Sequence, residues 1–207
     1  MKKNYEMDMC SGPILGKLLT FTIPLIFSGI LQLLFNAADV IVVGRFAGSQ
    51  SLAAVGSTTA LINLMINIFI GLSVGVNVIV ARYYGAKREK DVQDTIHTAM
   101  ALSIVSGLFL IIVGQLLSRP MLELMGTPDD VIDKSTIYMR IIFIGMPANM
   151  IYNFGSAILR AVGDTKRPLY FLTAAGVINV VLNLFFVIMF RMDVAGVALA
   201  TAISQAI

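Results

Sequence analysis

Charged residues are sparse in this chain, and the intervals between them are long and apolar. Six intervals contain no Asp, Glu, Lys or Arg: Leu18–Ala38, Phe46–Ala81, Thr95–Ser118, Ile141–Leu159, Pro168–Phe190 and Val194–Ile207. A membrane-spanning helix needs about 20 mainly apolar residues, and the first five intervals are long enough. The sixth begins like a helix and reaches the last residue, so we expect a helix that is cut short.

These intervals, with the turns between them, predict six helices in a single membrane domain, residues 1–207. The approximate bounds are 14–43, 52–81, 92–117, 134–160, 168–190 and 194–207. The short, Gly-containing or charged segments 44–50, 82–91 and 163–168 are typical of connections. The expected fold class is therefore an all-α integral membrane protein, a polytopic bundle of five full transmembrane helices and a truncated sixth.

The overall composition agrees with this interpretation. Of the 207 residues, 57% are hydrophobic and 13% are charged, and the mean hydropathy is +0.87. A soluble domain has about 45–50% apolar and about 25% charged residues, so a soluble enzyme is not expected. The single cysteine, Cys10, and the single histidine, His97, exclude a metal site built from either residue type. We expect no cofactor, and the net charge of +3 gives no reason to expect a nucleic acid partner.

Lysine and arginine lie unevenly on the two sides of the predicted bundle. One side holds ten of them: Lys2, Lys3, Lys17, Arg82, Lys87, Arg88, Lys90, Arg160, Lys166 and Arg167. The other side holds five: Arg45, Arg119, Lys134, Arg140 and Arg191. Because cytoplasmic loops carry the excess of positive charge, we expect a multi-pass protein of the cell membrane with a cytoplasmic N-terminus.

Several predicted helices carry polar residues at helical spacing on otherwise apolar sequence. The candidates for lining a cavity are Gln32, Asn36, Asn63, Asn67, Asn149 and Asn153, and the fifth helix adds Asn179 and Asn183. Residues three or four apart share a helix face, and hydrocarbon cannot satisfy a polar stripe. The stripes therefore indicate a common polar interior. The alternative is that each amide only links two helices, with a contribution of about 0.6 kcal/mol.

Asp39 is the one carboxylate well inside a predicted span. An ionised Asp near the bilayer centre costs about 2.5 kcal/mol or more, so such a residue is typically a proton relay, an ion ligand or a substrate contact. The alternative is a structural Asp near the outer face. Pro24 and Pro147 lie in the middle of predicted helices, where the missing backbone N–H predicts a kink or a hinge.

Five segments together resemble one family of transporters. They are Asn36–Arg45, Ser51–Gly56, Ala81–Lys87, Leu159–Pro168 and Val194–Thr201. In this order and spacing they resemble the first helix and its turn, the first and second cytoplasmic loops and the start of the sixth helix of multidrug and toxic compound extrusion (MATE) transporters. The resemblance covers essentially the whole chain, but only the first of the two six-helix lobes that family members have.

The resemblance implies a half transporter whose partners are the missing C-terminal lobe, the lipid bilayer and a small amphipathic or cationic substrate. Family members export drugs and organic cations by alternating access, coupled to inward flow of H⁺ or Na⁺. The cation site of some members falls on Asp39, Asn179, Asn183 and Thr201. The position of Asn183 is an Asp where that site is best defined, so this chain keeps one carboxylate in place of two.

Three other functions are considered beside the antiporter. A lipid-linked sugar flippase of the same superfamily would be expected to carry more Arg and Lys inside its spans. An intramembrane enzyme would need a catalytic pair that one carboxylate and one histidine do not supply, so we expect no enzyme. A non-transporting fragment is the third alternative.

Overall fold

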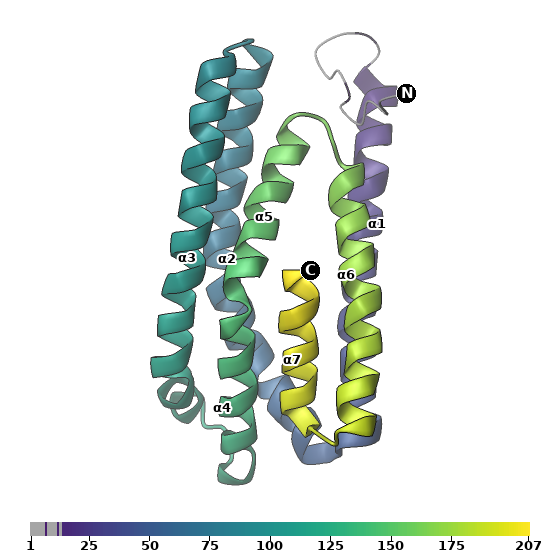
Figure 1. Cartoon of the computed structure of the whole chain (residues 1–207), viewed down its shortest axis with the longest axis vertical. Helices are drawn as coiled ribbons and strands as arrows, with labels where there is room; N and C mark the ends of the chain where they lie inside the picture. The colour runs from purple at the N-terminus through teal and green to yellow at the C-terminus, as the bar shows by residue number, and fades with distance from the viewer. Residues whose placement is uncertain (1–6, 8–11, 13) are drawn as a thin grey trace.

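The computed structural model describes residues 7, 12 and 14–207, and this part of the chain is built from helices without a strand (Figure 1). The elements in chain order are α1 (Ile14–Val42), η1 (Val43–Ala47), α2 (Ser49–Gly85), α3 (Glu89–Leu124), α4 (Asp129–Ile144), α5 (Met146–Ala161), α6 (Lys166–Leu184), η2 (Phe185–Met189) and α7 (Asp193–Ala206). The predicted all-α fold class is thereby confirmed. Lys2, Lys3 and Cys10, which entered the sequence analysis, lie outside the described residues.

In the described residues, four helical segments are long and apolar enough to cross a membrane, or five if the bent pair α4 and α5 is one span. All four extend past a predicted bound: the first continues to Ala47, the second begins at Ser49, the third continues to Leu124 and the fourth begins at Lys166. The uncharged intervals mark the apolar part of a span, whereas backbone hydrogen bonding continues into its polar ends. The last helix, α7, is shorter, with 14 residues.

The stretch predicted as one helix over 134–160 is two helices, bent by 49° at Gly145. Pro147 lies at the start of α5 and has no N–H to donate to the carbonyl four residues earlier, so the helix is interrupted there. Pro24 has a different setting. It is buried within α1, which is assigned as one continuous helix from Ile14 to Val42, and a kink at this position stays a prediction.

Glycine residues allow three close helix contacts, of α3 with α5, of α3 with α4 and of α6 with α1. On α3, Gly107 faces the backbone of Pro147 and Gly114 faces the ring of Phe143, and an added Cβ would collide at either place. On α6, Gly176 leaves room for the ring of Phe35 from α1. Small side chains let helices approach closely where lipid supplies no hydrophobic drive to associate.

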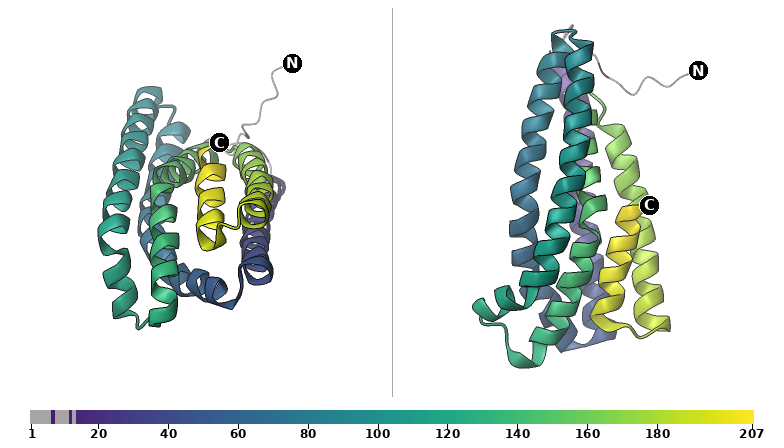
Figure 2. Two further views of the ribbon diagram at one scale, coloured as in Figure 1. Left: turned by 60° about the horizontal axis from the view of Figure 1, so that its bottom comes forward. Right: turned by 60° about the vertical axis from the view of Figure 1, so that its left-hand side comes forward.

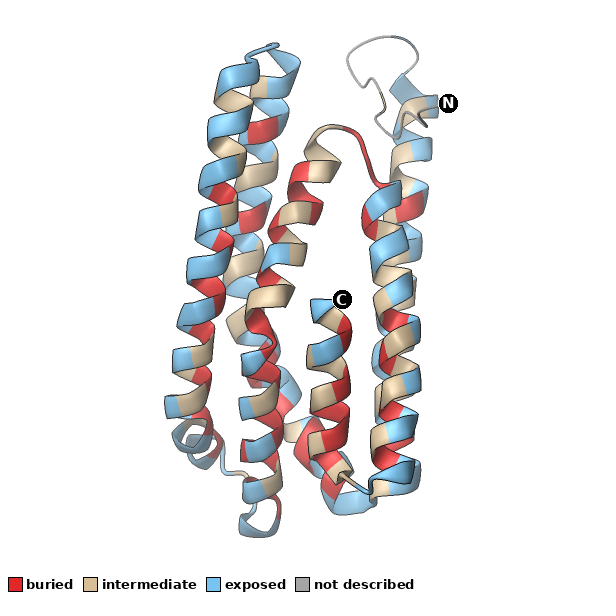
Figure 3. Ribbon diagram, viewed as in Figure 1, coloured by how far each residue is buried: buried red, intermediate tan, exposed pale blue. Residues whose placement is uncertain are grey.

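These contacts divide the bundle into a larger group, α2 to α5, and a pair formed by α1 and α6, with α7 between them (Figures 1 and 2). Buried residues lie mainly on the helix faces that point inward, and exposed ones on the outer faces (Figure 3). The outer faces carry many large apolar side chains, among them Leu33 at 70% and Leu116 at 68% exposure. Such a surface suits lipid and not water.

The contact between α3 and α5 gives a test of the packing. Replacing Gly107 with Ala should lower the free energy of unfolding by about 1–3 kcal/mol, because the new methyl group meets backbone that cannot rotate away. The measurement is the apparent melting temperature of the purified protein in detergent. Gly75→Ala is the matched control, since no atom lies within 4 Å of its added Cβ. Equal melting temperatures for the two variants would contradict the packing.

Candidate functional site

A chain of hydrogen bonds joins three helices at the residues that the resemblance singled out. The Asn183 side-chain N–H donates to Asp39 Oδ1 and, at 3.2 Å, to Asn179 Oδ1. The Asn179 side-chain N–H donates to Thr201 Oγ1 at 3.1 Å, and the Thr201 hydroxyl donates to the Val197 carbonyl at 3.0 Å. The structure therefore brings all four predicted coupling residues together, from α1, α6 and α7; we name Asp39, Asn179, Asn183 and Thr201 the coupling cluster.

The local sequence explains why these residues meet. Asn179 and Asn183 are four apart, so they share the face of α6 that is buried in the bundle. The close approach of Phe35 to Gly176 places α1 against the same helix and brings Asp39, one turn further along, to Asn183. Thr201 follows from α7, which packs on α6.

The coupling cluster has one unsatisfied oxygen. Asn183 Oδ1 is buried and has no hydrogen-bond partner. Buried acceptors are nearly always paired, and both amide N–H groups of Asn183 and one of Asn179 are already donated to other oxygens. The cluster therefore presents a carboxylate, a free amide oxygen and a hydroxyl oxygen, a set that would accept a proton on Asp39 or a small hard cation.

Sequence reasoning missed two buried or paired polar groups on α4, the helix that packs against α7. Tyr138 of α4 is buried in the core of the bundle. Lys134, one turn earlier, donates to Asp193 Oδ2 at 3.0 Å and to Ser51 Oγ at 3.1 Å, which ties α4 to the start of α7 and to α2. The spacing of four residues between Lys134 and Tyr138 puts both on one helix face and could have marked that face as polar. A tyrosine in a membrane helix is explained equally well by packing alone, so the spacing did not single it out.

The six predicted cavity-lining residues have different surroundings. Gln32, Asn36, Asn63 and Asn67 are exposed on α1 and α2, and Asn149 and Asn153 are partly buried on α5. A cavity of about 240 Å³ lies between α1, α2 and α5, and of the six only Asn153 lines it. A shared polar interior for all six stays a prediction.

The described residues contain no cluster of three or more His, Cys, Asp or Glu side chains that could hold a metal ion.

Comparison with known proteins adds independent information. The chain is 35% identical over 188 residues to the probable multidrug resistance protein YoeA of Bacillus subtilis strain 168, covering 89% of this chain and 41% of that protein. It is 32% identical to the probable multidrug resistance protein YpnP of the same strain, covering 97% of this chain and 45% of that protein.

Among solved structures, the chain is similar to the outward-facing conformation of a multidrug resistance MATE family transporter of the MOP superfamily. The TM-score is 0.85 with 28% sequence identity, and the match covers 91% of this chain and 42% of that one. The chain thus spans less than half the length of the proteins that it matches. The MatE family profile matches residues 24–185. With the fold, the spacing of its motifs and this match in agreement, the chain belongs to the MatE family.

Proposed function

We propose that this chain forms the ion-coupling half of a secondary transporter in the cell membrane that exports small amphipathic or cationic compounds by alternating access. The observation that carries the proposal is the coupling cluster, in which the one carboxylate inside a span is bonded to a buried amide from another helix. Two relatives named as probable multidrug resistance proteins support the substrate class.

The chemistry of the cluster supports coupling to H⁺ or Na⁺. Ionised Asp39 accepts the Asn183 N–H, while the Asn183 carbonyl oxygen has no donor. Protonation would turn one oxygen of Asp39 into a donor, and a bound cation would be attracted to the same oxygens. Either event removes an uncompensated negative charge between α1 and α6, so ion binding and helix packing would be linked.

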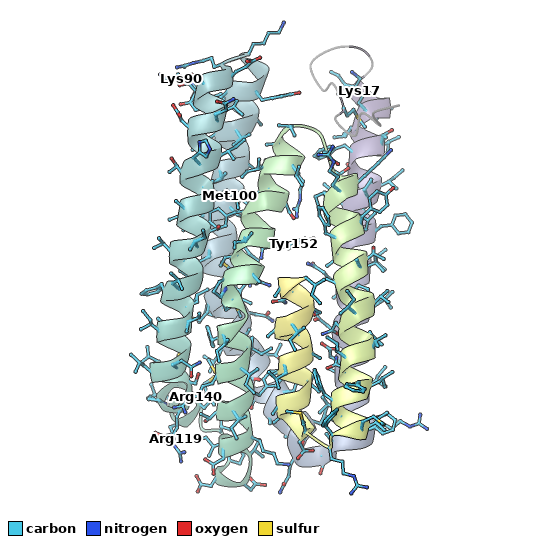
Figure 4. The ribbon with its side chains drawn as sticks, viewed as in Figure 1. Lys17, Lys90, Met100, Arg119, Arg140 and Tyr152 are labelled. Carbon is cyan, nitrogen blue, oxygen red and sulfur yellow. The ribbon has the colours of Figure 1, made fainter. Side chains whose placement is uncertain are left out.

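We also propose that the N-terminus faces the cytoplasm. In the structure the start of α1 and the α2–α3 and α5–α6 connections lie toward one end of the bundle, the end near Lys17 and Lys90 (Figure 4). Arg119 and Arg140 lie toward the other end. The larger number of Lys and Arg at the first end supports placing it in the cytoplasm.

Removing the carboxylate should uncouple transport. In Asp39→Asn the coupling site can no longer change charge, so gradient-driven efflux of a fluorescent organic cation should fall at least tenfold, toward the empty-vector level. The measurement uses an efflux-deficient bacterium, with membrane abundance checked by immunoblot. Asp94→Asn, the same change at an exposed position of α3, is the control and should transport normally. Normal efflux by Asp39→Asn would refute the coupling role.

Restoring a second carboxylate tests the ion. Asn183→Asp places two carboxylates in contact, an arrangement that holds Na⁺ more tightly than one carboxylate with an amide. We expect efflux by this variant to gain a dependence on Na⁺ that the parent protein lacks. Transport would be measured in vesicles at fixed pH with and without a Na⁺ gradient. If the parent already requires Na⁺ to the same degree, the missing carboxylate is irrelevant to ion choice.

The orientation can be tested by cysteine labelling in a Cys10→Ser background. Ala86→Cys, in the α2–α3 connection, should resist a membrane-impermeant maleimide added to intact cells, whereas Asp130→Cys at the start of α4 should react. Both positions are exposed, so accessibility depends on the side of the membrane. The reverse pattern would invert the proposed topology, and permeabilised cells should label at both sites.

A further inference from the structure

The 240 Å³ cavity between α1, α2 and α5 lies apart from the coupling cluster and has an amphipathic wall. Its apolar side is formed by Phe21 and Leu25 of α1 with Ile70 and Val74 of α2. Its charged group is Arg160, in the last turn of α5. The cavity is smaller than the roughly 300–1,000 Å³ of pockets that enclose drug-sized ligands, so it suits a small molecule or one end of a larger one.

Among the described residues, Arg160 has no counter-ion. Its Nε is buried with no hydrogen-bond partner, and none of the ion pairs within the described part of the chain includes it. Burying a guanidinium donor without an acceptor is costly, and the cost disappears when an anion binds. The favourable position of Arg160 at a helix C-terminus does not satisfy this N–H.

The nearest carboxylate in sequence is already engaged. Asp164 Oδ1 accepts the backbone N–H groups of Lys166 and Arg167 at 3.1 Å each, which caps the start of α6. Its Oδ2 lies 3.0 Å from Arg167 Nε, an ion pair by distance that lacks hydrogen-bond geometry, so Oδ2 itself accepts no hydrogen bond. Asp164 is therefore paired with Arg167 and stabilises the α5–α6 turn, and no ion pair joins it to Arg160 within the described residues.

The remaining polar groups of the wall are engaged as well. The Asn77 side-chain N–H donates to the Ala157 carbonyl at 2.7 Å and ties α2 to α5 beside the cavity. The Asn153 side-chain N–H donates to the Asn149 backbone carbonyl at 2.9 Å. These bonds hold the wall in place, and Arg160 Nε is the side-chain donor that stays buried without an acceptor in the described part of the chain.

We propose that this cavity binds a small amphipathic monoanion, whose carboxylate, phosphate or sulfonate group pairs with Arg160 while its apolar body lies against Phe21, Leu25, Ile70 and Val74. Guanidinium groups suit planar oxyanions because they donate in a fixed fork. The anion comes either from a soluble organic acid or from an acidic membrane lipid, since both offer this chemistry. The site goes beyond the proposed export of cationic compounds and does not depend on the Asp39 cluster.

Binding to the purified protein in phosphatidylcholine nanodiscs tests the proposal. The probe is 2-naphthoate, a fluorescent aromatic carboxylate, and its matched cation is naphthalen-2-ylmethylammonium. We expect saturable binding of 2-naphthoate at least tenfold tighter than that of the cation. Arg160→Gln should weaken 2-naphthoate at least tenfold, and Arg160→Lys should weaken it less, because the charge stays while the donor fork is lost. Arg82→Gln, which changes a basic residue outside the cavity, should leave the affinity unchanged.

Asp39→Asn separates this site from the transport proposal, because it should bind 2-naphthoate like the parent protein even when efflux is lost. Replacing part of the lipid with phosphatidylglycerol shows whether the natural anion is an acidic lipid or a soluble acid. The experiment is done at 0.5 M salt to screen surface charge. Competition with 2-naphthoate indicates an acidic lipid, and its absence indicates a soluble acid; both support an anion site. Equal affinity of the parent protein for anion and cation, absence of saturable binding, or equal effects of Arg160→Gln and Arg82→Gln would overturn the proposal.

Discussion

A helix surrounded by hydrocarbon has no solvent that can pair with its polar side chains, and this constraint accounts for most of the architecture. Many asparagine, serine and threonine side chains within the spans either bond back to their own helix or reach another one. Asn77 reaches α5 and Asn183 reaches α1, whereas Thr58 bonds to a carbonyl of its own helix. The hydrogen bonds between helices form where small residues allow the helices to approach closely. Close packing and side-chain hydrogen bonding therefore stabilise the same contacts.

The most consequential of these bonds is the one from Asn183 to Asp39, because α1 packs mainly on α6 and η1 and makes few contacts with the larger group of α2 to α5. Its outer faces carry exposed apolar side chains. The position of α1 therefore depends strongly on its contact with α6, at the close approach to Gly176 and at the Asp39 carboxylate. A change in charge on that carboxylate acts on the part of the bundle that is least restrained by other contacts.

The sequence was sufficient to predict a feature where the residue type at that position has few physical explanations. Sparse charge defined the helices, and a lone carboxylate within a span identified Asp39, because few structures tolerate one there. It did not separate Asn153, which lines a cavity, from Asn63, which is exposed, because both are amides at helical spacing. It also treated Arg160 as one of many loop cations, since the lack of a partner for its Nε depends on how α5 ends relative to α1 and α2.

The bundle contains the carboxylate of Asp39 and the guanidinium of Arg160 in separate sites, and α1 contributes residues to both sites. Phe21 and Leu25 line the cavity that contains Arg160, and Asp39 belongs to the coupling cluster nearer the opposite end of the same helix. Pro24 lies between Phe21 and Leu25, where the missing N–H leaves the carbonyl of Thr20 without its helical donor and makes the segment easier to bend. The contacts that fix the two sites differ, because the cavity is completed by α2 and α5 whereas Asp39 bonds to Asn183 of α6. The two sites therefore share one helix without sharing a residue or a hydrogen bond, so the charge of Asp39 and an anion at Arg160 act on different helix contacts.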